Sequence, residues 1–322
     1  MDYKTNSFTA ANALPIKIFK NAELVESLNK KFIPPIHVQF IPTNRCNLNC
    51  SFCSCKKRNK TEELPLNEII GLISTLKKLG CKAVTITGGG EPLMHPQISE
   101  IINAFYSNNI KIGLVTNGLL LHRLSFEDLS KIHWCRVSCC DERRFEPSKD
   151  ILEVTVQCGR NVDWAFSYVV SKNFDPKNLE KYIRFANEHN FTHVRVVSDL
   201  CDLDECPDME IIRAHITTDD RLVIYQGRKQ YDPGQKKCWI SLLKPVIGAD
   251  GEIYPCCGVQ YAHQEQDLDL PQSMCMGTIG DIESIYNKQT PFEGSVCARC
   301  YYKNYNDILD QMIVPTEHME FV

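Results

Sequence analysis

The stretch "IHVQFIPTNRCNLNCSFCSC", residues 36–55, joins an apolar segment directly to four closely spaced cysteines. Residues 36–43 indicate a β-strand that leads without a break into a cysteine-rich loop. The four thiols belong to Cys46, Cys50, Cys53 and Cys55. A strand that ends in such a loop points to chemistry at the carboxyl end of that strand.

The composition is that of a globular protein with more than one unit. The chain has 322 residues, more than one compact core usually holds, so we expect a main domain and a smaller one. The formal net charge of −4 argues against a broad surface for nucleic acid. Neither a signal peptide nor a run of roughly 18 apolar residues is present. We therefore expect a cytoplasmic protein without a membrane partner and with nucleic acid unlikely.

The chain contains 17 cysteines, a high number for a protein of a reducing compartment. Disulfides are rare there, so clustered cysteines more often bind metal or catalyse. Isolated cysteines in apolar stretches are more often small buried side chains. Those expected to be buried in this way are Cys81, Cys135, Cys139, Cys158 and Cys201.

Strands and helices alternate along the first two thirds of the chain. Strands are expected at 36–43, 82–90, 111–117, 134–140, 163–170 and 193–199. Helices are expected at 67–79, 96–108, 125–131 and 176–190. This alternation indicates right-handed crossovers and an α/β fold, a partial (β/α)6 TIM-like barrel. The expected units are an N-terminal extension at 1–35, the barrel at 36–230 and a small C-terminal domain at 231–322.

Several polar motifs fall at the expected carboxyl ends of these strands. They are the cysteine loop, "TGGGEP" at 87–92, "TNG" at 116–118 and Ser138. In parallel barrels the chemistry gathers at this end of the strands. The motifs are therefore expected to share one site. The basic run "KKRNK" at 56–60 is expected to be a solvated loop.

The cysteine loop favours an iron–sulfur cluster over zinc. A structural zinc ion needs four ligands, and Cys55 is close to Cys53 for the two to bind one ion. Three thiolates suit a [4Fe–4S] cluster that leaves one iron open to a cofactor. In the glycine loop, glycines allow close approach of the backbone to a ligand, and Glu91 is an acceptor for a cationic amino group.

The loop resembles the signature of the radical S-adenosylmethionine (radical SAM) superfamily, C-x-x-x-C-x-aromatic-C. The matching residues are Cys46, Cys50, Phe52 and Cys53. The resemblance implies a cluster whose open iron chelates S-adenosylmethionine. It also implies a flavodoxin- or ferredoxin-type reductant and a 5′-deoxyadenosyl radical that abstracts a substrate hydrogen. Phe52 matches the aromatic position near the adenine.

Other residues match further positions of the superfamily, whose second motif is G-G-E-P. The resemblance implies that the cofactor-binding residues are Phe52, Gly88, Gly89, Gly90, Glu91, Asn117 and Ser138. Asp141 is not assigned to the cofactor, because it is shifted by one position from the usual motif. His95 is expected to orient the loop and the start of the next helix.

A second set of cysteines lies near the C-terminus. Its spacing resembles the twitch domain, a shortened relative of the SPASM domain, which implies a fully ligated auxiliary [4Fe–4S] cluster. The implied ligands are Cys238, Cys256, Cys297 and Cys300. "GADGEIYPCC" at 248–257 is expected to form a hairpin with Asp250-Gly251 at its turn. Cys257 or Cys275 could replace a ligand, and zinc is the alternative metal.

The resemblance favours an oxidoreductase that removes two electrons from a small molecule, with the auxiliary cluster as electron acceptor. The enzymatic alternatives are a peptide-modifying maturase and an epimerase. The non-enzymatic alternative is an iron–sulfur electron carrier or sensor, which needs neither the glycine loop nor an open iron. Tyr168, Arg195 and Asp199 are candidate polar groups facing the barrel mouth, and the catalytic base is unassigned.

Overall fold

The computed structural model describes residues 13–143, 151, 153, 155, 162–227, 232–261 and 271–314. Its main element is a curved sheet of ten strands in the order β11-β10-β9-β1-β2-β3-β4-β5-β6-β7. Seven of the strands, β1 to β7, follow one another in parallel. These seven are His37–Phe40, Ala83–Ile86, Lys111–Thr116, Ile132–Cys140, Asp163–Val170, His193–Ser198 and Val223–Gln226.

The C-terminal segment extends this sheet at its first strand. β9, Val246–Ile247, pairs in parallel with β1, and β10, Glu252–Tyr254, pairs antiparallel with β9. β11, Gly277–Thr278, completes that edge. A separate two-stranded sheet joins β8, Lys237–Cys238, to β12, Phe292–Glu293. The C-terminal cysteines are thus attached to the same sheet as the cysteine loop.

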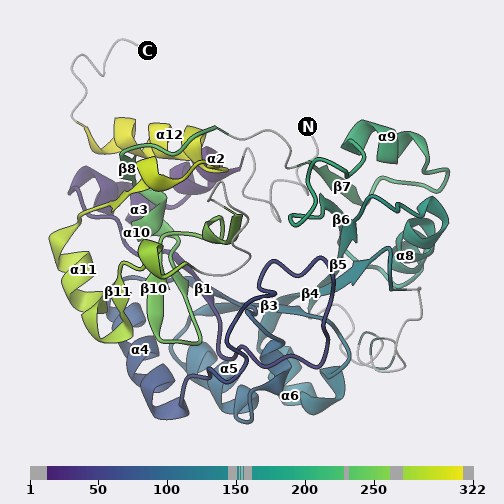
Figure 1. Ribbon diagram of the computed structural model, residues 1–322. Coiled ribbons are helices and arrows are strands. Elements are labelled where there is room, and N and C mark those ends of the chain that lie inside the picture. The colour runs from purple at the N-terminus through teal and green to yellow at the C-terminus, as the bar shows by residue number, and fades with distance from the viewer. Residues whose placement is uncertain are drawn as a thin grey trace.

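Helices cover the outer side of the curved sheet, while the cysteine loop lies on its inner side (Figure 1). The α-helices are α2 (Leu14–Phe19), α3 (Ala22–Asn29), α4 (Leu66–Lys78), α5 (Ile98–Ser107), α6 (Phe126–Ser130), α8 (Pro176–Glu188), α9 (Met209–Ala214), α10 (Ile240–Leu243), α11 (Ile282–Lys288) and α12 (Lys303–Ile313). The short 3-10 turns are η1 (Pro92–Met94), η2 (Leu121–Arg123), η4 (Val259–Tyr261), η5 (Gln272–Met274), η6 (Ile279–Asp281) and η7 (Gly294–Val296). No helix in the described ranges is both long and apolar enough to span a bilayer.

The helices form where apolar residues recur with helical spacing and where a capping residue marks the start of the helix. In α5, apolar side chains recur with helical spacing at Ile98, Ile101, Ile102 and Phe105, and all four are buried. α8 begins where the carboxylate of Asp175 accepts hydrogen bonds from the first backbone amides and Pro176 takes the first helical position. Both helices therefore bury one face against the sheet.

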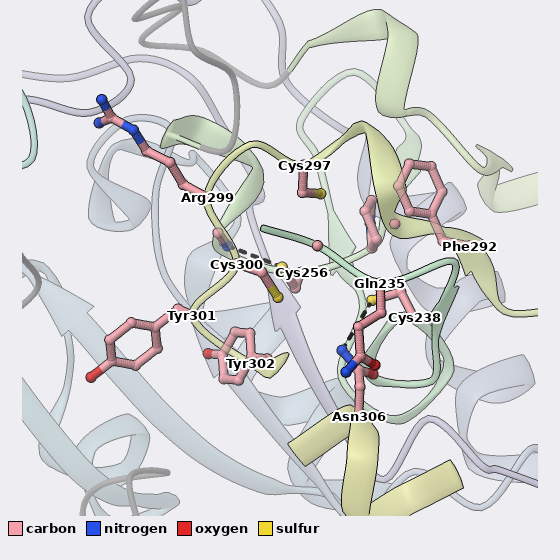
Figure 2. Close-up of a pocket in the computed structure, with 14 residues that line it drawn as sticks. Gln235, Cys238, Cys256, Phe292, Cys297, Arg299, Cys300, Tyr301, Tyr302 and Asn306 are labelled. Carbon is pink, nitrogen blue, oxygen red and sulfur yellow. Dashed lines mark hydrogen bonds between the residues drawn. The ribbon is translucent and has the colours of Figure 1, made fainter. Parts of the chain in front are cut away.

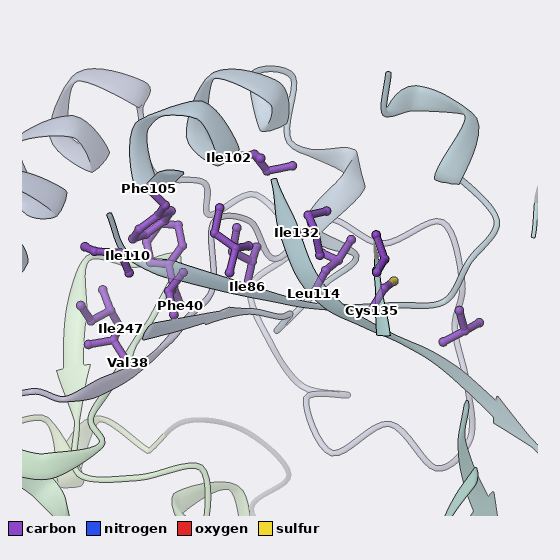
Figure 3. Close-up of a cluster of buried hydrophobic side chains, with 14 of the residues drawn as sticks. Val38, Phe40, Ile86, Ile102, Phe105, Ile110, Leu114, Ile132, Cys135 and Ile247 are labelled. Carbon is purple, nitrogen blue, oxygen red and sulfur yellow. The ribbon is translucent and has the colours of Figure 1, made fainter. Parts of the chain in front are cut away.

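The main hydrophobic core lies between the sheet and these helices (Figure 3). Phe40 of β1 meets Phe105 of α5 edge to face, with ring centroids 5.6 Å apart. Ile86, Leu114 and Cys135 continue the same layer across β2, β3 and β4. This rigid layer fixes the strand ends from which the functional loops emerge.

The expected partial barrel is confirmed, with all six expected strands and four expected helices present within a few residues. The sequence reading missed β7, whose side chains are half-buried and whose neighbours are charged. Such a strand has a weak apolar signal.

The domain boundaries at residues 35 and 230 remain predictions. The hairpin expected at Asp250-Gly251 is confirmed, and Gly251 has a left-handed backbone with φ of 79°.

The expectation that isolated cysteines are buried is confirmed for Cys81, Cys135 and Cys139. It is wrong for Cys201, which is only half-buried. Cys201 lies after the end of β6, where burial, then the charge of Asp199 and then the Cys53 thiol raise its pKa to about 12. Cys158 lies outside the described residues.

The expectation that Tyr168 faces the barrel mouth is wrong. Tyr168 is 0 % exposed and packs edge to face on Tyr182 of α8. Its hydroxyl donates to the carboxylate of Asp141 at 2.7 Å and accepts from the Asn178 amide at 3.0 Å. Alternation along β5 turns this side chain toward the helices. Tyr168 therefore joins the end of β4 to α8.

This contact leads to a prediction about stability. Tyr168→Phe removes a hydrogen bond to a carboxylate and is expected to lower the free energy of unfolding by about 1–2 kcal/mol. Urea unfolding measures the change. The control is Tyr106→Phe, because Tyr106 is 50 % exposed and its loss of a hydroxyl should be neutral. Equal stabilities for the two variants would contradict the structural role given to Tyr168.

Candidate cofactor site and cysteine pocket

The cysteine loop, residues 44–55, lies at the carboxyl end of β1. Cys46, Cys50 and Cys53 are half-exposed. Burial raises the pKa of Cys50, and the neighbouring thiols Cys53 and Cys46 raise it further. The backbone amide of Leu48 donates to Cys46 Sγ at 3.4 Å. Cys46 and Cys53 thus lie close enough to Cys50 to act on its thiol, and three neighbouring thiols form a donor set that suits an iron–sulfur cluster.

The glycine loop packs directly against the cysteine loop. The amide of Gly90 donates to the carbonyl of Thr43 at 3.2 Å, and the amide of Glu91 donates to the carbonyl of Arg45 at 2.8 Å. A Cβ atom on Gly90 would lie 2.1 Å from the carbonyl oxygen of Arg45, and one on Gly89 would lie 1.9 Å from the side chain of Asn44. These glycines are therefore needed to hold the loop that carries the thiols.

Position 88 requires glycine because of a contact within the glycine loop itself. A Cβ atom on Gly88 would lie 1.4 Å from the carbonyl oxygen of Gly90. No side chain fits there without a change in the loop backbone. The three consecutive glycines are thus explained by contacts inside the protein, and their contact with the cofactor stays a prediction.

Glu91 has a positioning role that the sequence did not reveal. It is 2 % exposed. Its carboxylate accepts hydrogen bonds from the Thr116 hydroxyl and the Asn117 amide, both at 2.7 Å, and from the Leu93 amide at 3.2 Å. Burial raises the pKa of Glu91, although these donors counteract the shift. Glu91 thereby ties the glycine loop to the end of β3, and its contact with a cofactor amino group stays a prediction.

The ends of β3 and β4 are joined by Asn117 and Arg143. The Asn117 side-chain amide donates to Asn47 of the cysteine loop at 2.7 Å. Arg143 Nη1 donates to the carbonyls of Asn117 at 2.8 Å and Ser138 at 3.3 Å. Burial raises the pKa values of both Cys50 and Glu91, and the positive charge of Arg143 offsets part of that rise. Sequence reasoning missed Arg143, because it lies outside every motif that was recognised.

Phe52 and Ser138 are both half-buried at this end of the sheet. Ser138 lies on β4 beside Ser167 of β5, which in turn pairs with Arg195 of β6. The structure therefore brings Ser138 into a row of polar residues across three strands. The contacts of Phe52 and Ser138 with the cofactor stay predictions.

His95 orients the start of α5, as expected. Its Nδ1 accepts from the amide of Gln97 at 3.1 Å, and its Nε2 contacts the carbonyl of Leu64 at 2.9 Å. An acceptor at Nδ1 requires the proton at Nε2. Asp141, which was not assigned to the cofactor, accepts bonds from Tyr168 and the amides of Ser171 and Asp175. Both residues support the site from within the protein.

Cys55 connects the cysteine loop to the C-terminal segment. Cys55 is 4 % exposed, and its sulfur accepts a hydrogen bond from Gln260 Nε2 at 2.9 Å. The hydroxyl of Ser54 donates to the other end of the same amide, Oε1, at 2.8 Å. Gln260 lies in η4, only four residues beyond Cys256. Cys55 thus has a structural partner, and the two cysteine-bearing segments are bridged by one side chain.

The four C-terminal cysteines predicted as ligands line one pocket, here called the cysteine pocket (Figure 2). Its sulfur-bearing residues are Cys238, Cys256, Cys297 and Cys300. Cys257 and Cys275 do not line it. The sulfur of Cys257 instead lies 3.2 Å from the Tyr302 hydroxyl, and that of Cys275 accepts from the amide of Gly277 at 3.4 Å. The lining favours Cys256 over Cys257 as the ligand.

Close backbone contacts bring the segments of this pocket together. The amide of Gly234 donates to the carbonyl of Cys297 at 2.7 Å. A Cβ atom on Gly234 would lie 1.9 Å from the carbonyl oxygen of Gly294. At the other side, the amide of Gly258 donates to Cys256 Sγ at 3.2 Å and the Asn306 amide points to Cys238 Sγ at 3.9 Å. N–H donors around the sulfurs suit thiolate ligands.

The thiols of the pocket influence one another electrostatically. Burial, with a smaller contribution from Cys300, raises the pKa of Cys238 to about 11. Burial, together with Cys238 and Cys300, raises the pKa of Cys297 to about 12. Bound metal ions invert this trend, because a coordinating thiol is deprotonated by the charge of the metal. Ionisation of these buried thiols is therefore unfavourable without a metal and favourable when they bind one.

Zinc and a [4Fe–4S] cluster need different spacings of the same four thiols. In the parts of the chain that the structure describes, no three His, Cys, Asp or Glu side chains converge on a position for one metal ion. The sulfurs of a tetrahedral zinc site lie about 3.8 Å apart, since each Zn–S bond is about 2.3 Å. Thiols that each bind a different iron of a cube stand farther apart.

Comparisons with known proteins agree with this site. The family model described as the radical SAM superfamily matches residues 40–139. A probable GTP 3′,8-cyclase of Archaeoglobus fulgidus is 33% identical over 250 residues, which are 66% of this chain and 83% of that protein. A probable GTP 3′,8-cyclase of Methanothermobacter marburgensis is 25% identical over 297 residues, 79% of this chain and 93% of that protein.

Two solved structures share the fold. Streptococcus suis SuiB bound to the precursor peptide SuiA matches with a TM-score of 0.59 and 16% identity, over 90% of this chain and 82% of that chain. The structure of anSMEcpe with bound AdoMet and a peptide matches with a TM-score of 0.53 and 14% identity, over 90% and 86% of the two chains. From its sequence relatives, its fold and its cysteine loop, this chain belongs to the radical SAM superfamily, whose members bind a [4Fe–4S] cluster and S-adenosylmethionine.

Proposed function

We propose that this enzyme oxidises a small molecule by two electrons and holds two [4Fe–4S] clusters. Cys46, Cys50 and Cys53 bind the cluster that holds S-adenosylmethionine, and the cysteine pocket binds the auxiliary cluster. The observation that carries the proposal is the gathering of four thiols in that pocket. Four thiolates leave no iron open, which suits an electron acceptor better than a substrate ligand.

The bound cofactors supply a 5′-deoxyadenosyl radical at the first site and an electron acceptor at the second. For a two-electron oxidation the substrate loses one hydrogen atom, one proton and one electron. The hydrogen atom would end on 5′-deoxyadenosine, the proton would go to a base, and the electron would be taken up by the auxiliary cluster that Cys238, Cys256, Cys297 and Cys300 would hold. Gln260 supports such a transfer, because it joins the cysteine loop to the segment that follows Cys256.

The inner face of β4, β5 and β6 supports a small anionic substrate. Arg136 Nη2 points to His193 Nε2 at 3.4 Å, and Arg195 Nη2 donates to the Ser167 hydroxyl at 3.0 Å. Burial, followed by the charges of Arg136 and Arg195, lowers the pKa of His193 to about 3. We infer that the two guanidinium groups on this face pair with a carboxylate or phosphate group of the substrate.

A second candidate is the cyclisation of a nucleotide. The relative that is 33% identical is named a probable GTP 3′,8-cyclase, and phosphate groups would also suit the basic inner face. The two candidates differ in outcome, since an oxidation reduces an acceptor and a cyclisation of GTP yields a new nucleotide. The peptide-bound structures share the fold at 16% identity or less, and that likeness does not extend to the substrate.

Anaerobic reconstitution, with iron and sulfide counted per chain, tests the proposal. We expect about eight irons per chain, from two four-iron clusters. Dithionite and S-adenosylmethionine should then yield 5′-deoxyadenosine, which a simple electron carrier would not produce. Incubation with GTP under the same conditions tests the second candidate, through a new nucleotide product.

Matched variants assign the irons to the two sites. Cys256→Ala should lower the count to about four irons, while Cys257→Ala should leave it at about eight. Production of 5′-deoxyadenosine should continue in both variants. Four irons in the unaltered protein would remove the auxiliary cluster and the oxidation proposal with it, and a new product from GTP would favour the cyclase.

A further inference from the structure

Arg58 is a buried arginine in contact with the cysteine loop. The run "KKRNK" was expected to be solvated, and Lys56, Lys57, Asn59 and Lys60 are indeed exposed. Arg58 is the exception, because it is only 8 % exposed. Its guanidinium turns inward and donates to Cys53 Sγ at 3.3 Å. That sulfur belongs to one of the three proposed cluster ligands.

The guanidinium is held at this sulfur by two further contacts. Arg58 Nη1 also donates to the carbonyl of Cys55 at 2.6 Å, and Nε donates to the carbonyl of Asn44 at 2.9 Å. These two carbonyls lie at the beginning and end of the cysteine loop. A planar guanidinium fixed at both ends presents its N–H groups in one direction, which a flexible lysine cannot do.

A cation at a cluster sulfur has a definite electrostatic effect. Reduction adds one negative charge to a cluster, and a nearby positive charge stabilises the reduced form more than the oxidised form. Hydrogen bonds to the sulfurs act in the same direction. Burial strengthens the effect, because the charge is less screened by water. The amide of Leu48 at Cys46 Sγ is a neutral donor by comparison.

We propose that Arg58 is a positioning residue that raises the reduction potential of the cluster bound by Cys46, Cys50 and Cys53. It does so through the directed N–H bond and charge at Cys53, and it also clamps the loop that holds the thiols. The inference rests on the proposed assignment of Cys53 as a ligand. It does not depend on the substrate or on the reaction that follows.

The test is a redox titration of the first cluster, followed by electron paramagnetic resonance in the Cys256→Ala background. In that background the auxiliary cluster contributes no signal. Arg58→Met keeps the length of the side chain but removes its charge and donors. At a fixed potential we expect roughly a tenfold lower ratio of reduced to oxidised cluster, in line with the loss of one charge-assisted hydrogen bond. For one electron this is about 59 mV toward more negative potential.

Lys60→Gln is the matched control, because it removes an exposed cation two residues away. Its potential should equal that of the parent protein. A second readout is 5′-deoxyadenosine formation. Arg58→Met should be slow with a weak reductant and should recover with a strong one, whereas a merely misfolded site would not recover.

If Arg58→Met fails to load iron, the reduction potential of Arg58→Lys tests the proposal instead. Lysine keeps the charge but cannot maintain all three contacts, so a potential below that of the parent supports the proposal. A loaded Arg58→Met or Arg58→Lys protein with the parent potential overturns it. Absence of any cluster in the parent protein is a different result, since it would overturn the proposed function itself.

Discussion

Alanine at Cys46, Cys50 or Cys53 is expected to abolish the first cluster and reduce 5′-deoxyadenosine formation to background. Each of these thiols holds a different iron, so the loss of one leaves two ligands for the whole cluster. Anaerobic reconstitution followed by iron counting and product assay measures both effects. In a protein that is otherwise unaltered, the iron count should fall from about eight to about four, because the cysteine pocket is untouched.

Cys55→Ala is the control for this series. Its sulfur accepts a hydrogen bond from Gln260 and lies among buried residues. We expect the variant to retain the first cluster and its activity, with a modest loss of stability from a missing buried contact, about 1–2 kcal/mol. If Cys55→Ala lost the cluster while one of the other three variants kept it, the ligand assignment would be wrong.

Gly90→Ala is expected to damage the first cluster site strongly, although it alters no thiol. Its Cβ atom would lie 2.1 Å from the carbonyl oxygen of Arg45 and 2.5 Å from the carbonyl carbon of Asn44. Both atoms are backbone, so the cysteine loop would have to move. Overpacking of this kind costs about 1–3 kcal/mol or more. We expect low iron content together with weak binding of S-adenosylmethionine, measured by iron assay and calorimetry.

Gly71→Ala provides the matched control for Gly90→Ala. Gly71 lies in α4 and no atom lies within 4 Å of the position that its Cβ would take. An alanine there should stabilise the helix by about 0.5–1 kcal/mol and leave the cluster unchanged. A Gly90→Ala protein with full iron content and normal cofactor affinity would show that the close contact with the cysteine loop is dispensable.

The alternation of apolar segments and turn signals was sufficient to predict the barrel. Strong local patterns identified β5 at its observed ends and α5 and α8 within two residues. β7 was missed, because "VIYQ" is short and half-buried and its stability comes from pairing with β6. The pairing of β9 with β1 was also not foreseen, since a contact between residues 39 and 246 leaves no local trace in either segment.

The candidate site was likewise predicted only in part from the sequence. Spacing alone identified the two sets of cysteines, because metal clusters demand thiols at few and regular separations. The spacing favoured Cys256 as a ligand and left Cys257 as an alternative, and of the two only Cys256 lines the cysteine pocket. The sequence analysis also placed Tyr168 at the barrel mouth. The alternation of side chains along β5 instead turns Tyr168 toward α8.

The sequence by itself determined the fold class, the family and the two groups of thiols. Each of these is encoded in residues close together in the chain or in a fixed spacing. Only the tertiary structure decided the roles of Arg58, Glu91, Gln260 and Arg143. Their functions depend on partners brought close by folding, such as Gln260 at Cys55, 205 residues away. Hydrogen bonds of this kind depend on distance and direction in space, which local sequence does not record.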